Sequence, residues 1–305
     1  MRRIWWIGGI ALAAVAVGLA LVQAASLALF GPLGHVPSAA RAFGSTWPFD
    51  AARATGVDRW PPVAVELARA ALIRDEPARA GTLLAGLPAG ASVDDLRGQI
   101  AVANGRFAEA IALFGASGDV VRADATIDGV AERDPLAAYA LAASFARDVG
   151  RRDAPAPVRA DAAWRAGQRA AAVAAARPAE AARYDAIALG FYRDAVAGDP
   201  TQEAYLLASG LGALATGDAA ASREAYRRAV AVVPNSVDGY VGLAVSEARL
   251  GDCPASRADL TRAQTFAVRQ RRVVDPMRAG YDASSRTALQ RCILTSNDPY
   301  PSISR

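Results

Sequence analysis

The sequence predicts an all-α fold, and three observations lead to this prediction. Alanine and arginine are the commonest of the 305 residues, whereas aromatic residues make up only 7%, and such a composition favours helices over strands. Two segments near the C-terminus repeat at a spacing of 34 residues. Near the N-terminus, an uncharged apolar stretch is long enough to form a membrane-spanning helix.

The apolar stretch runs from Ile4 to Phe30 without a charged residue. A helix of this length exceeds the hydrocarbon core of a bilayer, which is about 30 Å thick. Trp5 and Trp6 lie at one end of the stretch, where indole rings favour the headgroup region. The alternative is a cleaved signal peptide, because small residues surround Gln23, but a secretory apolar core is only about 7 to 15 residues long. We therefore expect a transmembrane anchor.

The flanking charges predict how this anchor is oriented. Arg2 and Arg3 precede it, and no basic residue follows until Arg41, so the positive-inside rule leaves the N-terminus cytoplasmic and the remaining chain outside. In a bacterium this is a single-pass inner-membrane protein with a periplasmic domain. The predicted organisation is an anchor or uncleaved signal over residues 1–30, a linker over 31–60, diverged helical repeats over 61–200, two regular repeats over 201–270, and a C-terminal capping helix with a tail over 271–305.

The regular repeats are residues 203 to 234 and 237 to 268. Identical residues align between them: Gly217, Asp218, Ala221, Ser222, Arg223, Arg228 and Ala229 with Gly251, Asp252, Ala255, Ser256, Arg257, Arg262 and Ala263. Thirty-four residues is the period of the tetratricopeptide repeat (TPR). The first unit resembles this family at Leu206, Gly210, Gly217, Asp218, Tyr226, Ala229 and Pro234, and the second at Tyr240, Leu243, Ala244, Gly251, Asp252, Leu260 and Ala263. The resemblance implies helical hairpins stacked into an α-solenoid.

Weaker copies precede these units. Residues 91 to 117 keep the same relative spacing, and a further hairpin is expected from Val63 to Leu87. Between 119 and 200 the pattern loosens, with Trp164 opening one long helix, and we interpret this stretch as diverged hairpins. An ordinary helical bundle is the alternative for this middle third.

Predicted helix starts support the division into hairpins. Asp134 and Asp275 each precede a proline, and Asn235 or Ser236 precedes the last repeat. These are residue types that favour N-cap positions, and proline favours the first helical turn.

The two cysteines lie in the C-terminal third. Cys253 lies in the turn of the last repeat, and Cys292 ends a helix predicted from Pro276 through Tyr281 and Leu289. This helix is the expected cap of the stack. In an oxidising compartment a disulfide between the cysteines would attach the cap, whereas two unrelated buried thiols are the alternative.

Catalytic motifs are missing from the sequence. The single histidine, His35, lies in the linker, and no lysine is present for a phosphate-binding loop. We expect no enzyme activity, no cofactor and no metal. Nucleic acid is not an expected partner, because removing Arg2 and Arg3 from the net charge of +4 leaves about +2.

The resemblance implies a protein-binding groove lined by the first helix of each hairpin. The corresponding positions are Leu207, Leu211, Leu214 and Ala215, followed by Asp238, Val241, Val245 and Arg249. This mostly apolar groove is covered either by the chain's own C-terminal helix or by a segment of a partner. A separate cluster, Arg269, Arg271 and Arg272, fits acidic lipid headgroups or an anionic polymer, or is simply a solvated helix end.

These features predict a membrane-tethered periplasmic scaffold or assembly factor that binds protein partners. One alternative is an accessory subunit of polysaccharide or cell-envelope biosynthesis or export, in contact with that machinery. Another is a regulatory adaptor of reversed topology that faces the cytoplasm.

Overall fold

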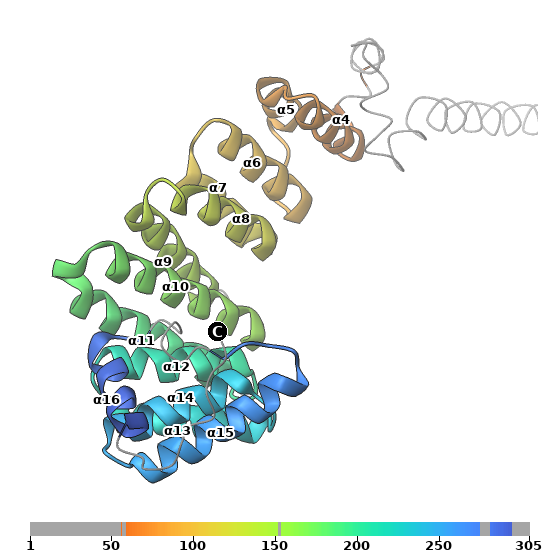
Figure 1. Ribbon diagram of the computed structural model, residues 1–305. Coiled ribbons are helices and arrows are strands. Elements are labelled where there is room, and N and C mark those ends of the chain that lie inside the picture. The colour runs from red at the N-terminus through yellow and green to blue at the C-terminus, as the bar shows by residue number, and fades with distance from the viewer. Residues whose placement is uncertain (1–55, 57–58, 152–153, 275–280, 295–305) are drawn as a thin grey trace, which may run out of the picture. The chain divides into compact units, whose positions relative to one another are not determined.

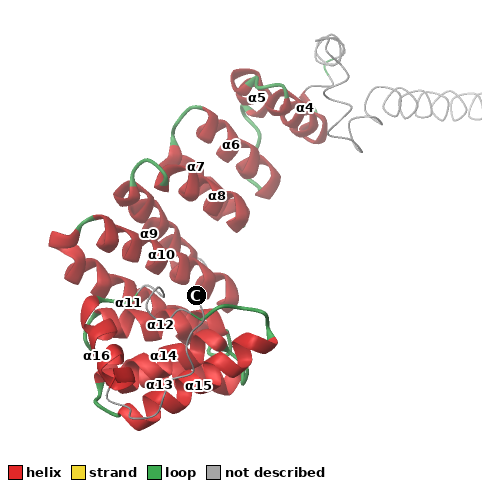
Figure 2. Ribbon diagram, viewed as in Figure 1, coloured by secondary structure: helices red, strands yellow, loops and turns green. Residues whose placement is uncertain are grey.

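The computed structural model describes residues 56, 59–151, 154–274 and 281–294, and within these ranges it contains helices and no strands (Figures 1 and 2). The predicted all-α fold is confirmed for this part of the chain. Two compact units, residues 1–119 and 120–305, are considered separately below. The predicted boundaries after residues 30, 60, 200 and 270 stay predictions.

In the part of the first unit that the structure describes, the helices form two hairpins. Its helices are α4 (Pro61–Ile73), α5 (Pro77–Leu84), α6 (Ala91–Ala103) and α7 (Phe107–Ser117). Helix α4 packs against α5, and α6 packs against α7. These are the two hairpins predicted at Val63–Leu87 and at residues 91 to 117.

The described residues of the second unit form four further hairpins and one additional helix. The hairpins are α8 (Val120–Ala131) with α9 (Pro135–Arg151), α10 (Ala156–Ala176) with α11 (Ala181–Gly198), α12 (Glu203–Ala215) with α13 (Ala219–Val232), and α14 (Val237–Arg249) with α15 (Cys253–Arg269). A 3₁₀ turn, Pro178–Glu180, joins α10 to α11, and α16 (Ala283–Leu294) follows the last hairpin. Each hairpin packs on the next (Figure 1).

A glycine facing an aromatic ring brings the helices of a hairpin together in three places. A Cβ atom on Gly98 would lie 2.5 Å from the ring of Phe114, one on Gly167 would lie 2.6 Å from Tyr192, and one on Gly210 would lie 2.7 Å from Tyr226. The glycine therefore provides the space that the ring fills.

The middle third of the chain thus keeps the packing of the regular repeats despite its different spacing. Its additional residues lengthen α10 to 21 residues and form the 3₁₀ turn. Trp164 does not open a helix as predicted, because α10 already begins at Ala156. Pro155 at the N-cap and Pro157 in the first turn favour a start two turns earlier.

In the recurring Gly-Asp pair, the glycine forms the turn between the helices and the aspartate caps the next helix. Gly217 and Gly251 adopt positive φ angles of 87° and 82° in the turns between helices. This conformation is strained for a residue that has a side chain. Asp218 and Asp252 cap the helices that follow, since each accepts a hydrogen bond from the backbone N–H three residues later. In the first hairpin, Asp75 occupies the left-handed turn position itself, with φ of 60°.

Two further predicted N-caps lie within the described residues, and a third does not. Asp134 accepts hydrogen bonds from the N–H groups of Leu136 and Ala137 at 3.0 Å, and Ser236 accepts one from Gly239 at 2.9 Å. Both predictions are confirmed, and Ser236 rather than Asn235 is the capping residue. The predicted cap at Asp275 lies outside the described residues.

No helix in the described ranges is long and apolar enough to cross a membrane. The predicted anchor, Ile4 to Phe30, lies outside those ranges, as does His35 in the predicted linker.

Tyr226 connects the last two hairpins. Its ring fills the space beside Gly210 of α12 and Gly242 of α14, where an added Cβ on Gly242 would approach the ring to 2.3 Å. With an exposure of only 3%, the ring has no room to withdraw. The distance between α12 and α14 therefore depends on two positions that have no side chain.

This packing predicts that Gly242→Ala destabilises the protein by about 1 to 3 kcal/mol, the usual cost of overpacking a core. Gly190→Ala is the matched control, since Gly190 is exposed within α11 and no atom lies within 4 Å of its added Cβ. The control should be neutral or stabilise by up to about 1 kcal/mol through helix propensity. Urea unfolding monitored by circular dichroism measures both, and equal effects would contradict the proposed role of Tyr226.

Candidate functional site

The candidate site is the groove predicted along the first helices of the last two hairpins, α12 and α14. Leu207, Leu211, Leu214 and Ala215 lie on α12, and Asp238, Val241, Val245 and Arg249 lie on α14, as expected from the repeat register. The structure brings only some of these side chains together.

Helix α14 is enclosed on all sides. Every residue from Val241 to Ala248 is buried, and eight consecutive residues make more than two turns, which covers the full circumference of a helix. Helices α12, α13 and α15 account for three sides, and α16 packs against the fourth. The α14 part of the groove is therefore filled by the protein itself.

Helix α16 does not continue the stack in the regular way. At the preceding junction α14 packs mainly on α13 and only slightly on α12, whereas α16 packs mainly on α14 and less on α15. It therefore lies over the first helix of the last hairpin (Figure 1). The sequence offered two places for this helix, the end of the stack and the groove, and the groove receives most of its contacts.

Side chains of the C-terminal segment join the groove residues in one hydrophobic cluster. Leu289 and Cys292 of α16 and Tyr281 before it are buried together with Leu214, Val241 and Val245, and Leu207 packs at the edge of the cluster. The cluster explains why the apolar first-helix positions are not exposed to solvent on α14.

The polar ends of the predicted groove bind the same C-terminal region. Arg249 donates hydrogen bonds to Asp282 at 3.3 Å, to Ser285 at 3.2 Å, and to Ser284. Asp238 forms an ion pair of 3.1 Å with Arg272, in the segment that follows α15. These two residues are therefore occupied within the chain.

Asp282 also determines where α16 begins. Its Oδ1 atom accepts a hydrogen bond of 2.7 Å from the backbone N–H of Ser285, which makes it the N-cap. Burial raises the pKa of Asp282, but the hydrogen bonds from Ser285 and Ser284 outweigh this and lower the pKa below its usual value. The predicted helix from Pro276 through Tyr281 is wrong at Tyr281, which precedes the cap, and residues 275–280 lie outside the described ranges.

Tyr281 is anchored by a second tyrosine. The hydroxyl of Tyr226, which lies between α12 and α14, is hydrogen-bonded to the hydroxyl of Tyr281. Burial raises the pKa of Tyr281 to about 12, so both phenols remain neutral at physiological pH. The residue that sets the spacing of the two hairpins thus also fixes the segment leading into α16.

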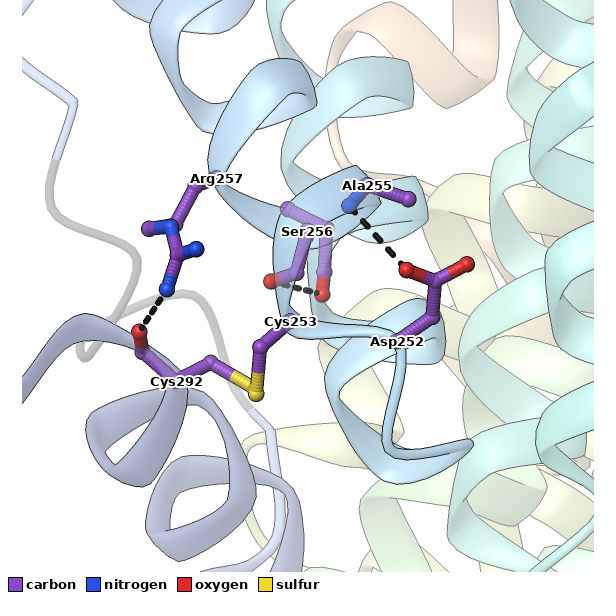
Figure 3. Close-up of a disulfide and its surroundings, with 7 residues drawn as sticks. Asp252, Cys253, Ala255, Ser256, Arg257 and Cys292 are labelled. Carbon is purple, nitrogen blue, oxygen red and sulfur yellow. Dashed lines mark hydrogen bonds between the residues drawn. A yellow bond between two sulfur atoms is a disulfide. The ribbon is translucent and has the colours of Figure 1, made fainter. Parts of the chain in front are cut away.

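A disulfide fastens the other end of α16. Cys253 at the start of α15 is bonded to Cys292, which is 1% exposed (Figure 3). Beside it, Arg257 donates a hydrogen bond of 3.2 Å to the backbone carbonyl of Cys292. Ser256 donates one of 2.7 Å to the carbonyl of Ala244, which ties the same end of α15 to α14.

The α12 part of the groove is covered only in part by the described residues. Leu211 is 38% exposed and Ala215 is exposed as well, although they hold the same repeat positions as Val245 and Arg249. An exposed leucine alone is ordinary. Leu211, however, lies beside the part of the groove that α16 fills, so Leu211 is the accessible part of the predicted site.

Charged residues on two other first helices of this unit, α8 and α10, form ion pairs that the sequence pattern did not reveal. Asp124 and Asp128 of α8 pair with Arg165 and Arg169 of α10. Both pairs span the same sequence separation, and in each helix the two partners lie four residues apart on one face. This spacing of like charges was a signal in the sequence, but it does not reveal which helix supplies the opposite charges.

One buried carboxyl pair lies between α14 and α15. Glu247 is 5% exposed, and its Oε2 atom is the one buried side-chain oxygen or nitrogen without a hydrogen-bond partner in the described ranges. Burial, together with the nearby carboxylate of Asp259, raises the pKa of Glu247 to about 7. Asp259 also accepts a hydrogen bond of 2.8 Å from Arg262. The two carboxyls share a site in which only one ionises readily.

Metal ligands are not clustered in the described ranges, where no group of three histidine, cysteine, aspartate or glutamate residues could hold an ion.

Comparisons with known proteins give similar structures but no related sequence. No family model matches the chain, and no curated protein matches it. Among solved structures, "Crystal structure of MamA protein" is similar at 14% identity and a TM-score of 0.43, covering 61% of this chain and 98% of that one. The structure of TTC0263, a thermophilic TPR protein in Thermus thermophilus, is similar at 14% identity and a TM-score of 0.40, covering 76% of this chain and 97% of that one.

The raised pKa of Glu247 predicts that the free energy of unfolding depends on pH, and that Glu247→Gln removes this dependence. Because folding raises the pKa of Glu247 from 4.5 to about 7, its stabilising contribution is complete below pH 4.5 and is lost as the pH rises through 7. The stability of the variant relative to the native protein should therefore increase over this range, by at most about 3 kcal/mol. Urea unfolding at several pH values measures the difference, and a constant difference would contradict the raised pKa of Glu247.

The disulfide predicts that Cys253→Ser with Cys292→Ser destabilises the last hairpin. The bond closes a loop with a sequence separation of 39 residues, for which the chain-entropy model gives about 4 kcal/mol. Hydrogen exchange should increase in α16 and along Val241 and Val245, which α16 covers. Unchanged protection of α14 would show that α16 is not what shields it.

Proposed function

We propose that this protein is a membrane-tethered scaffold that binds a protein partner along its TPR-like hairpins. The observation that carries the proposal is the difference between two equivalent first helices: α14 is sealed by α16, whereas α12 leaves Leu211 uncovered. The α12 surface is then the end of the groove that a partner contacts.

The helix that fills the α14 part of the groove indicates what kind of partner segment could bind the exposed α12 part. The occupant of the α14 surface is a short helix that presents Leu289 and Cys292 and is held at its N-terminus by Arg249. A partner helix with a narrow apolar face would use the same type of contact. The proposed partner is accordingly an amphipathic segment of another protein.

Tethering and location belong to the same proposal. The uncharged stretch from Ile4 to Phe30, with arginines on its N-terminal side, supports an inner-membrane anchor with the repeats in the periplasm. The disulfide between Cys253 and Cys292 supports an oxidising compartment. A C-terminal alkaline phosphatase fusion, active only outside the cytoplasm, tests this topology, and an inactive fusion of full abundance would favour the cytoplasm-facing adaptor.

The open groove predicts where a partner can be crosslinked. A photoreactive amino acid at Leu211 should crosslink to a partner in cells, whereas the same amino acid at Leu250 should not. Leu250 is the matched control, because it is 42% exposed, against 38% for Leu211, but lies at the turn between α14 and α15.

Once the partner is identified, Leu211→Asp should weaken its binding at least tenfold, which corresponds to about 1.4 kcal/mol. The reason is that a carboxylate must lose its hydration in an apolar contact. Isothermal titration calorimetry measures the change. Equal effects of Leu211→Asp and Leu250→Asp would contradict the groove as the binding surface.

A further inference from the structure

The tip formed by the C-terminal end of α15 and the following residues, Val268 to Val273, carries unusually exposed aliphatic side chains. Val268 is 78% exposed and Val273 is 92% exposed. Val232, at the end of α13, is 41% exposed. Gln270 donates a hydrogen bond of 2.9 Å to the carbonyl of Asn235, which brings the loop after α13 to this tip.

Arginines surround these valines. Residues 260–274 contain four arginines and no acidic residue. Arg272 is paired with Asp238, but no described residue forms an ion pair with Arg269 or Arg271. Arg269 lies over the ring of Phe266 at 6.0 Å, which holds its charge at the surface. The tip therefore combines projecting apolar groups with two arginines that form no ion pair within the described residues, and Asp275 follows two residues after Val273 in the sequence.

The form of this surface indicates its partner. A side chain that is 92% exposed has almost no neighbouring surface around it, so the described residues of the tip form no pocket or groove for a folded protein. A lipid surface needs none, because headgroups and acyl chains rearrange around an inserted side chain. Basic residues beside apolar ones are typical of segments that bind anionic membranes at the interface.

We propose that the tip, Val268 to Val273, binds the surface of an anionic lipid bilayer, with the valines inserted at the headgroup boundary and Arg269 and Arg271 against lipid phosphates. This contact is independent of the α12 groove. It would add a second attachment to the proposed anchor and hold the last hairpin against the membrane.

The test places a fluorophore at the tip of the full-length protein. Val268→Cys is labelled with a polarity-sensitive dye while the native disulfide stays intact, and the protein is reconstituted into phosphatidylcholine vesicles with or without phosphatidylglycerol. The expected result is a blue shift, together with quenching by spin-labelled lipids, only when phosphatidylglycerol is present. Val121→Cys is the matched control, since Val121 of α8 is also 78% exposed, and its label should show neither effect.

Charge variants test the role of the arginines. Arg269→Gln with Arg271→Gln should lower the ratio of bound to unbound tip about 25-fold, at about fivefold per arginine. Arg193→Gln with Arg286→Gln removes the same charge from exposed positions elsewhere and should leave the ratio unchanged.

Three results would overturn the proposal: no blue shift at position 268 and none with a second label at Val273→Cys, an equal shift at position 121, or a shift in detergent that grows with protein concentration and so reports self-association. Flotation of the vesicles reports the N-terminal anchor separately. Loss of the anchor and failure of the tip to bind are therefore distinguishable.

Discussion

The packing of the Tyr226 ring between two glycines governs the C-terminal part of this protein. A ring in this position determines how closely α12 and α14 approach, because Gly210 and Gly242 have no side chain to hold them apart. The phenol hydroxyl at the far end of the same ring binds Tyr281, which leads into α16. Hairpin spacing and the position of the last helix thus depend on one side chain.

The same arrangement explains why two equivalent helices differ. Both α12 and α14 present apolar groove positions, but α14 is covered throughout whereas α12 keeps Leu211 exposed. Three attachments hold α16 there: the Tyr226–Tyr281 hydrogen bond, the contacts of Arg249 with Asp282 and Ser285, and the disulfide. A helix of 12 residues is marginal in water by itself, so these attachments and the buried Leu289 are what keep it helical.

Local features of this fold could be predicted from the sequence. The glycine-aromatic contacts at Gly98 and Gly210, the turn glycines, and the caps at Asp134 and Ser236 follow from residue type and spacing, because each involves residues close in the chain. The groove positions were also predicted correctly as first-helix positions. Their burial was not decided, since the sequence left the groove to either α16 or a partner.

Long-range contacts were the features that sequence patterns did not reveal. The pairing of Asp124 with Arg165 joins residues 41 apart in different hairpins, and Glu247 occupies a position where the repeat pattern gives no reason to expect a buried carboxyl. In both cases the stability of the charged group depends on which side chain of a neighbouring helix lies opposite it. That neighbour is determined by how hairpins of unequal length stack. The start of α16 was misplaced for a related reason: proline at position 276 is a strong local signal, but the cap at Asp282 is held in place by Arg249 from α14.

Enclosure of α14 also imposes an order on assembly. The helix completes its burial only when Leu289 and Cys292 arrive, and these residues leave the ribosome after all the helices they pack against, whereas hairpins nearer the N-terminus can form as soon as they are synthesised. Until then Val241 and Val245 are exposed on a nearly finished domain. During the interval before α16 docks, the newly made chain therefore exposes this apolar surface to aggregation and to chaperones.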